Sequence, residues 1–325
     1  MSHDLAATSG STEVEERSSS LLPRLLAETF GTFLLTLVIV GALVYSPLNN
    51  VGGPGIALGG ALGGAFAYIA GAAAVGRVSG AHFNPAISLG AWLGGRTSLG
   101  GMFSYWGAQL VGAVLAGAVL FATVPRAYAT LLGVESVSDV FGSAVNGFAE
   151  LSWLSMQTDG QVQFGWLPAL LIEIIISAVL VGVYLGANDP RRKAAYAPVA
   201  VGSAIAALTL VSWFVTNTGM NPARSTAAAI FANSWGPDGS GRQLWLFWLA
   251  PLVGAALAAL FYRAFASAGP DEADEYEEHD EHDEHEEHDE HDEHEDEDEH
   301  DEDSSGDAKD EAAAPDVEKK TGDKA

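Results

Sequence analysis

Two asparagine residues carry the clearest chemical signal in the sequence. Each opens the same tripeptide, within SGAHFNPAIS and NTGMNPARST, and the two copies are Asn84-Pro85-Ala86 and Asn221-Pro222-Ala223. Proline in the first turn of a helix loses no hydrogen bond, and an asparagine before it can cap free N–H groups. Each tripeptide therefore predicts the start of a short helix, which presents an asparagine amide beside the positive end of the helix dipole.

The surrounding chain is apolar enough to place both tripeptides in a membrane. Of 325 residues, 48% are hydrophobic, and several apolar runs reach the roughly 18 to 20 residues that cross a bilayer. Many of the 37 glycines lie inside these runs, where small residues let membrane helices approach closely. The expected spans are 24–46, 55–77, 101–123, 166–187, 196–215 and 243–266.

The spans form two similar halves. Three spans and one tripeptide segment, 79–94 or 217–233, make up each half, and the halves begin alike with LLAETFGTFLL and LLIEIIISAVL. An odd number of spans inverts the second half relative to the first, so the two half-helices point at a shared site near the midplane. The sequence predicts an all-α membrane protein with six transmembrane helices, two re-entrant half-helices and an inverted repeat.

The basic residues orient this topology. Most fall on the side that carries both chain ends, which favours a multi-pass protein of the cell membrane with both termini in the cytoplasm. The first 20 residues are polar and no cleavable signal fits the first span, so that span is expected to stay as an anchor. The segment 124–165 links the halves on the outer side, and its length predicts that it packs over the outer mouth.

The C-terminal segment is chemically distinct. It holds 30 of the 42 acidic residues, although the net charge of the whole chain is −27. Its glutamate, aspartate and histidine repeat has no apolar period, which predicts a disordered acidic tail typical of proteins that work in high salt. We therefore divide the chain into a polar N-terminus at 1–20, a channel domain at 21–268 and a disordered tail at 269–325. Weak metal sites in the tail are the alternative, at His279, His282, His285, His288, His291 and His294.

The two tripeptides, the six spans and the inverted repeat resemble the major intrinsic proteins, the aquaporins and aquaglyceroporins, across residues 24–266. Within that family the chain is similar to the bacterial aquaporin Z type. The resemblance implies an hourglass pore in each protomer of a homotetramer. It also implies passive passage of water and small neutral solutes, with no cofactor, no firm metal site and no nucleic-acid partner.

Individual charged and polar residues gain roles from this resemblance. Arg224 follows the second tripeptide and is expected near the outer constriction, where it repels cations. Glu28 and Glu173 lie inside spans, and we expect them to accept hydrogen bonds from the backbones of the tripeptide loops. His82 is expected to brace the first loop rather than to gate the pore.

The expected filter is ambiguous. Gapless matching to the family places Gly64, Thr209 and Thr218 beside Arg224 at the outer constriction. Water channels of this type carry phenylalanine and histidine at the first two positions, so the filter here is expected to be wide and polar. A slip of register would place Phe66 there instead of Gly64.

These features leave several functions open. A water channel with some solute leak is favoured, and a facilitator for glycerol, urea or metalloid acids is the alternative. Ser225-Thr226 after the arginine and Leu246-Phe247-Trp248 in the last span favour the water channel. A structural or metal-sensing protein with a closed pore is an alternative of another class, which a cluster of bulky aromatics at the constriction would support and the expected Gly/Thr ring does not. An active transporter would need an intramembrane ion site, and the sequence offers none beyond charges that the pore already explains. An enzyme would need a nucleophile with a base, or a phosphate loop, and the sequence shows neither in its membrane core.

Overall fold

Long apolar helices dominate the computed structural model, which describes residues 20–45, 53–189, 195–232, 235–236 and 239–266. These residues belong to one compact unit, Met1–Gly269. The second unit, Pro270–Ala325, contains the acidic tail, and the histidines considered there lie outside the described residues.

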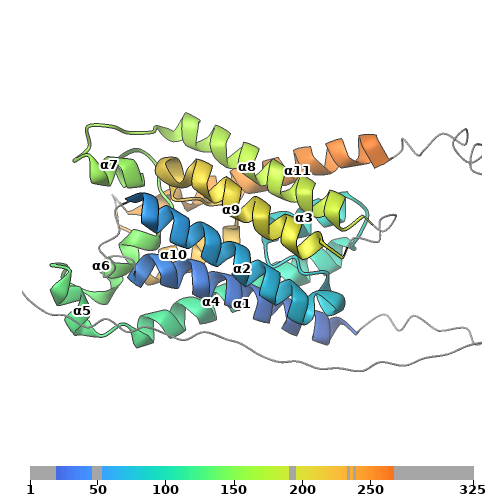
Figure 1. Ribbon diagram of the computed structural model, residues 1–325, viewed down its shortest axis with the longest axis horizontal. Coiled ribbons are helices and arrows are strands. Elements are labelled where there is room, and N and C mark those ends of the chain that lie inside the picture. The colour runs from blue at the N-terminus through green and yellow to red at the C-terminus, as the bar shows by residue number, and fades with distance from the viewer. Residues whose placement is uncertain (1–19, 46–52, 190–194, 233–234, 237–238, 267–325) are drawn as a thin grey trace, which may run out of the picture. The chain divides into compact units, whose positions relative to one another are not determined.

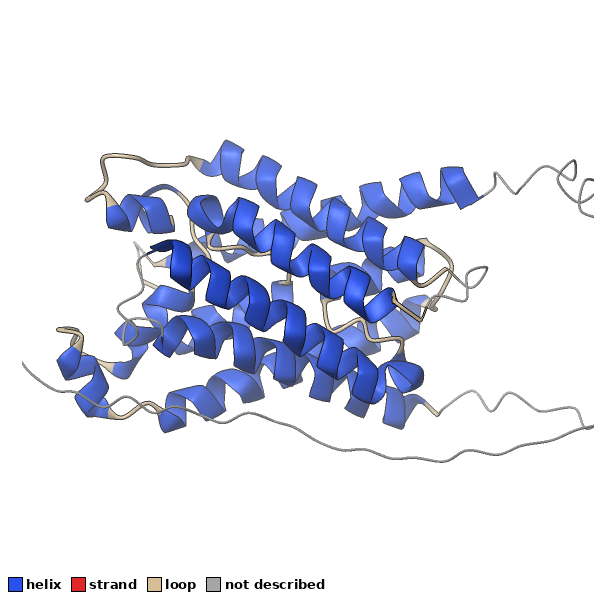
Figure 2. Ribbon diagram, in the orientation of Figure 1, coloured by secondary structure: helices blue, strands red, loops and turns tan. Residues whose placement is uncertain are grey.

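Six helices in the described ranges are long and apolar enough to cross a membrane. Their bounds are α1 Leu21–Tyr45, α2 Gly53–Ser79, α4 Leu99–Thr123, α8 Trp166–Ala187, α9 Ala197–Thr216 and α11 Leu244–Ala266. Each agrees with an expected span to within a few residues, and the described ranges contain no strand (Figure 2). The all-α membrane fold predicted from the sequence is therefore confirmed.

Two short helices fill the middle of the bundle, α3 Pro85–Leu93 and α10 Pro222–Phe231. Each begins at the proline of a tripeptide, and the asparagine before it is the N-cap in extended backbone. The cap bonds run from Ala86 N to Asn84 Oδ1 at 2.9 Å and from Ala223 N to Asn221 Oδ1 at 3.1 Å. Both half-helices thus start as the sequence predicts.

The two halves use glycine in the same way to bring helices together. A Cβ on Gly112 of α4 would overlap the Thr29 carbonyl oxygen of α1. A Cβ on Gly254 of α11 would overlap the Ile174 carbonyl oxygen of α8. Only glycine permits this approach of helix to backbone, and it packs the first and last long helices of each half tightly.

The segment between the halves folds over one end of the bundle. It contains α5 Arg126–Leu131, α6 Val137–Phe141 and α7 Trp153–Gln157, with 3₁₀ turns at Gly142–Ala144 and Ala149–Leu151; a further 3₁₀ turn, Ser240–Gln243, precedes α11. Figure 1 shows α5, α6 and α7 at the end opposite to the first residues of α1 and the last residues of α11. We call this end of the bundle the linker end.

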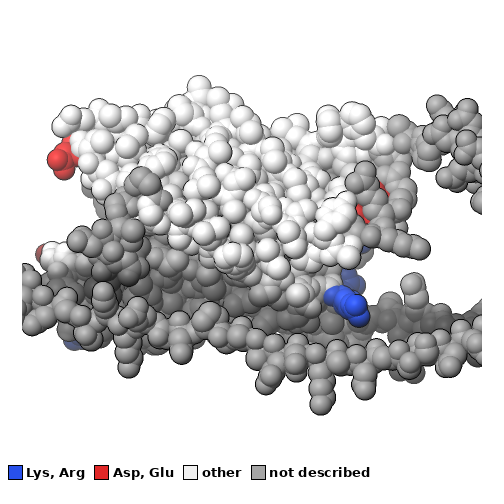
Figure 3. Space-filling view, viewed as in Figure 1, with Lys and Arg blue, Asp and Glu red and all other residues white. Residues whose placement is uncertain are grey.

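The side of the bundle is apolar. Figure 3 shows no lysine, arginine, aspartate or glutamate across the middle of the face that it presents. The long helices also carry large apolar side chains that are exposed, among them Phe66, Val199, Val211, Leu257 and Phe261. A surface of this kind suits lipid or another apolar protein surface.

Candidate functional site

The two tripeptide loops meet in the centre of the bundle through a reciprocal pair of hydrogen bonds. Asn84 Nδ2 donates to the Met220 carbonyl at 3.0 Å, and Asn221 Nδ2 donates to the Phe83 carbonyl at 2.9 Å. Each amide uses one of its two N–H groups in this way and its oxygen in the helix cap. The second N–H of each amide is left for a molecule in the pocket that both asparagines line.

The backbone before each asparagine adopts an unusual conformation at the same two places. Ala81 and Phe83 have φ of 53° and 50°, and Thr218 and Met220 have φ of 54° and 45°. These positions lie three residues and one residue before the asparagine in both loops. Left-handed backbone in non-glycine residues costs on the order of 1 to 3 kcal/mol at each position, so other contacts must hold the loops in place.

Glu28 supplies these contacts in the first half. Its buried carboxylate accepts from the backbone N–H groups of His82 at 3.0 Å and Phe83 at 2.7 Å, and from Gln109 Nε2 at 2.8 Å. The His82 ring lies between two tyrosine rings and bonds to Ser88 Oγ at 3.0 Å through Nδ1. His82 does not line the pocket shared by the two asparagines.

Glu173 does the same in the second half. It accepts from the backbone N–H groups of Gly219 at 2.7 Å and Met220 at 2.9 Å, and from Thr216 Oγ1 at 2.6 Å. The two glutamates are completely buried, and both bind the loop residues immediately before an asparagine. Charged groups inside a membrane need such partners, and here the partners are the strained loops.

Arg224 lies in the first turn of α10, and its side chain contacts the segment that links the halves. Its side chain is 2% exposed, and Nη1 donates to Asn146 Oδ1. Asn146 also accepts from Ser225 Oγ at 2.7 Å and donates to the carbonyls of Thr216 at 3.2 Å and Asn217 at 2.8 Å. A single amide of the linking segment therefore positions both the arginine and the second loop.

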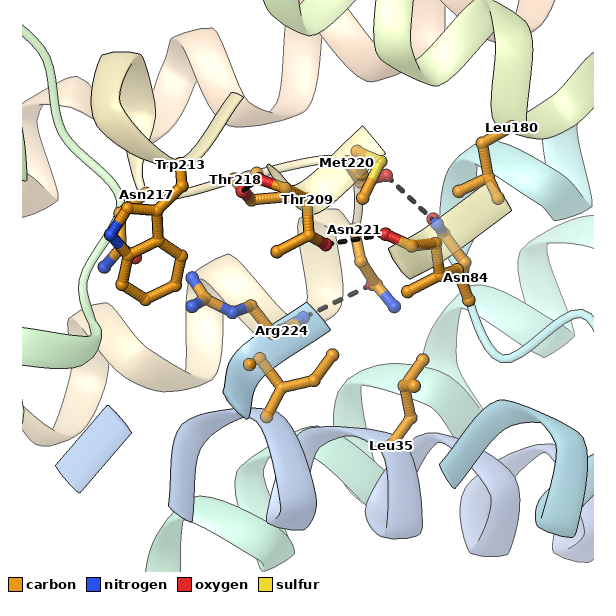
Figure 4. Close-up of a pocket in the computed structure, with 14 residues that line it drawn as sticks. Leu35, Asn84, Leu180, Thr209, Trp213, Asn217, Thr218, Met220, Asn221 and Arg224 are labelled. Atoms are coloured by element: carbon orange, nitrogen blue, oxygen red, sulfur yellow. Dashed lines mark hydrogen bonds between the residues drawn. The ribbon is translucent and has the colours of Figure 1, made fainter. Parts of the chain in front are cut away.

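One narrow pocket runs past these groups along the bundle. Figure 4 shows its course from the linker end inward, past Trp213, Arg224, Thr209, Asn221 and Asn84. Its other walls are formed by the loop backbone, by the polar side chains of Asn217 and Thr218, and by Leu35, Ile39, Gly60, Leu180, Ile205, Gly219 and Met220. The pocket thus joins the arginine to the meeting point of the half-helices.

Three of the four expected filter residues line the narrow pocket. Thr209, Thr218 and Arg224 line the pocket, whereas Gly64 does not. Gly60, one turn nearer the linker end of α2, lines it in place of Gly64. A Cβ on Gly64 would lie 3.2 Å from Ile205 Cγ2 and 3.2 Å from Ile39 Cδ1, so this glycine faces side chains of the wall.

Phe66, considered above as the other occupant of the filter, is 64% exposed on the outside of α2. The register that places Phe66 in the filter is therefore wrong.

Asn146, Trp213 and Gly60 are among the residues of the site that were not identified from the sequence. Asn146 lies in an irregular stretch of the linking segment, where no local pattern marks it. Trp213 follows Thr209 by one helical turn on α9, so helical spacing from Thr209 could have found it. Gly60 could have been found in the same way from Gly64.

The site has the properties of a conduit. It offers fixed hydrogen-bond donors along an apolar path, and the described residues contain no cluster of three or more side chains able to hold a metal ion. Six membrane-length helices around two half-helices, with this path of hydrogen-bond donors between them, define a membrane channel.

Comparison with known proteins agrees with that class. The chain belongs to the major intrinsic protein family, whose family model matches residues 15–262. It is 38% identical over 249 residues to aquaporin Z of Brucella melitensis biotype 1, which covers 75% of this chain and 97% of that protein. It is 36% identical over 248 residues to aquaporin Z of Photorhabdus laumondii, with the same coverage.

A solved structure has the same fold. The aquaglyceroporin from Plasmodium falciparum aligns with a TM-score of 0.58 at 21% sequence identity, over 75% of this chain and 96% of that one. At this identity the likeness shows the fold. Together with the family match, it makes this chain a transmembrane channel of a transport family rather than of an enzyme family.

Proposed function

We propose that this channel passes water and also admits small neutral solutes such as glycerol or urea. The observation that carries the proposal is the pair of asparagine amides at the meeting half-helices, with Arg224 on the same path. Aquaporin Z relatives support the water component. The small side chain of Thr209 in the pocket wall supports the solute component.

The mechanism follows from the direction of the donors. A water molecule at the centre accepts from the free N–H groups of Asn84 and Asn221, so its own hydrogens point away along the pore. A hydrogen-bonded file oriented in this way cannot relay a proton through its centre. The positive ends of α3 and α10 and the buried charge of Arg224 add barriers to hydronium and other cations.

The same proposal extends to the setting of the channel. We infer a multi-pass protein of the cell membrane, with the linker end outside and both termini in the cytoplasm. The apolar side of the bundle suits lipid and the subunit contacts of a homotetramer. We propose that the acidic tail is a solvated segment, so that a chain ending at Ala268 still assembles and conducts.

Stopped-flow light scattering on proteoliposomes tests the solute range. Vesicles with the wild-type protein should shrink faster than protein-free vesicles under an impermeant osmolyte and re-swell in glycerol or urea. Thr209→His, which narrows the path, should slow re-swelling more than shrinkage. Leu210→Phe adds a ring on the exposed side of the same helix and should change neither.

The possible results separate the two components of the proposal. Re-swelling at the protein-free rate, with fast shrinkage, would limit the channel to water. Shrinkage at the protein-free rate would contradict the channel function itself.

A further inference from the structure

Trp213 stands where two pockets meet. It lines the narrow pocket that contains Arg224 and the two asparagines, and it also lines a second pocket beneath the linking segment. Its side chain is 1% exposed, so its ring is enclosed between the two spaces. Any molecule that passes from one pocket to the other meets this ring.

The helix opposite Trp213 leaves room for the ring. A Cβ on Gly60 would lie 3.3 Å from Trp213 Cζ3, which is tighter than an ordinary contact. The bare glycine of α2 and the indole of α9 therefore form a matched pair across the path. This pair lies one turn nearer the linker end than Gly64 and Thr209, the positions at which the family resemblance implied rings that this chain lacks.

The polar atoms here lack protein partners. Trp213 Nε1, Arg224 Nε and Asn217 Oδ1 are buried, and none has a hydrogen-bond partner among the residues that the structure describes. All three residues line the narrow pocket, and Figure 4 shows the indole nitrogen at the same end of that pocket as the Asn217 amide. Buried donors and acceptors are almost always satisfied, so two donors and one acceptor left open here point to a molecule in the path.

We propose that Trp213 is the specificity-determining residue of the outer constriction. The Trp213 ring, packed opposite Gly60, determines the width of the path, and the indole N–H donates to an oxygen of the passing molecule. The solute class is a small neutral molecule with a hydroxyl or carbonyl oxygen and at least one hydrogen to donate, such as a short polyol or urea. This inference rests on the proposed channel function and names the residue that selects among its solutes.

Two substitutions separate the width of the ring from its hydrogen bond. Trp213→Phe keeps an aromatic ring and removes the donor, so glycerol and urea uptake should fall about fivefold, the change that one hydrogen bond makes. Trp213→Ala removes the ring, so glycerol uptake should rise above that of the wild type. Trp245→Phe is the matched control, because Trp245 is 49% exposed on the side of α11.

The measurement is stopped-flow uptake of glycerol and urea beside water efflux, in proteoliposomes of the full chain matched for protein content and elution profile. Opposite changes in glycerol uptake for the two variants, with Trp245→Phe like the wild type, would support the inference. Uptake equal to that of the wild type in both variants would overturn it. Equal loss of water and solute flux in both variants would also overturn it, because a residue that selects among solutes must change solute uptake relative to water efflux.

The wild-type protein provides the separate test of the underlying function. If it moves water no faster than protein-free vesicles, the proposed channel function fails before any variant is compared. If it conducts and the variants match it, the assignment to Trp213 fails alone.

Discussion

The substitution Asn146→Ala tests whether the linking segment positions Arg224 and the second loop. The Asn146 amide accepts from Arg224 Nη1 and Ser225 Oγ and donates to the carbonyls of Thr216 and Asn217. Two of these partners keep another bond after truncation. Ser225 Oγ still donates to the Asn221 carbonyl at 3.1 Å, and the Thr216 carbonyl still accepts from Gly147 N at 3.3 Å.

The cost of the change comes from the two partners that lose their bond to the amide. The Asn217 carbonyl loses the amide that it accepts from, and Arg224 Nη1 loses its acceptor. An orphaned buried polar group costs about 1–3 kcal/mol and a bond to a charged group is worth about 1.5–3 kcal/mol, so the variant should lose roughly 3–5 kcal/mol of stability. Arg224 also lines the narrow pocket, so a guanidinium released from Asn146 can move into that pocket, and water flux should also fall.

Thermal unfolding of the purified protein and stopped-flow shrinkage of proteoliposomes measure both effects. Asn188→Ala is the control. Asn188 is an exposed asparagine at the C-terminal end of α8, and its side chain makes a single hydrogen bond, to the Tyr184 carbonyl at 3.0 Å. The variant at Asn146 should unfold at clearly lower temperature than the control and conduct less water. Identical midpoints and identical flux in the two variants would refute the role assigned to the linking segment.

Three further changes test separate contacts. Gly31→Ala places a Cβ inside the Phe83 ring, so it should displace the first loop and lower water flux, whereas Gly59→Ala, with open space around it, should not. Stopped-flow shrinkage of the two variants decides this, and equal flux would contradict it. Glu173→Gln turns an amide toward N–H donors and should cost about 2–3 kcal/mol, seen as a lower midpoint of thermal unfolding; an unchanged midpoint would show that the carboxylate does not hold the loop. Phe66→Ala should leave water and glycerol flux unchanged because the side chain faces outward, and any change in selectivity would place it back in the filter.

The helices could be predicted because their signals are local. Apolar runs of membrane length, with proline at the first turn of each half-helix, determine where the elements begin and end. The inverted repeat followed from counting spans between the two tripeptides. None of these inferences depends on how distant side chains pack.

The pocket wall could be predicted only in part because it depends on packing between helices. Gly64 and Gly60 are one turn apart on α2, and the choice between them depends on the rotation of that helix against α9. The Trp213 ring packs against Gly60 because a glycine at that position leaves room for it. Asn146 reaches Arg224 through an irregular segment, and no periodicity in the sequence encodes such a contact.

The most direct test of the central claim measures water and proton flux in the same vesicles. Proteoliposomes loaded with a pH-sensitive dye are given an osmotic step and, separately, a pH step, with protein-free vesicles and vesicles containing a proton ionophore as references. If Asn84 and Asn221 orient a file of water as proposed, water should leave much faster than from protein-free vesicles while the dye reports the same proton leak as those vesicles. Water flux at the protein-free rate, or proton entry that rises with protein content, would contradict the account.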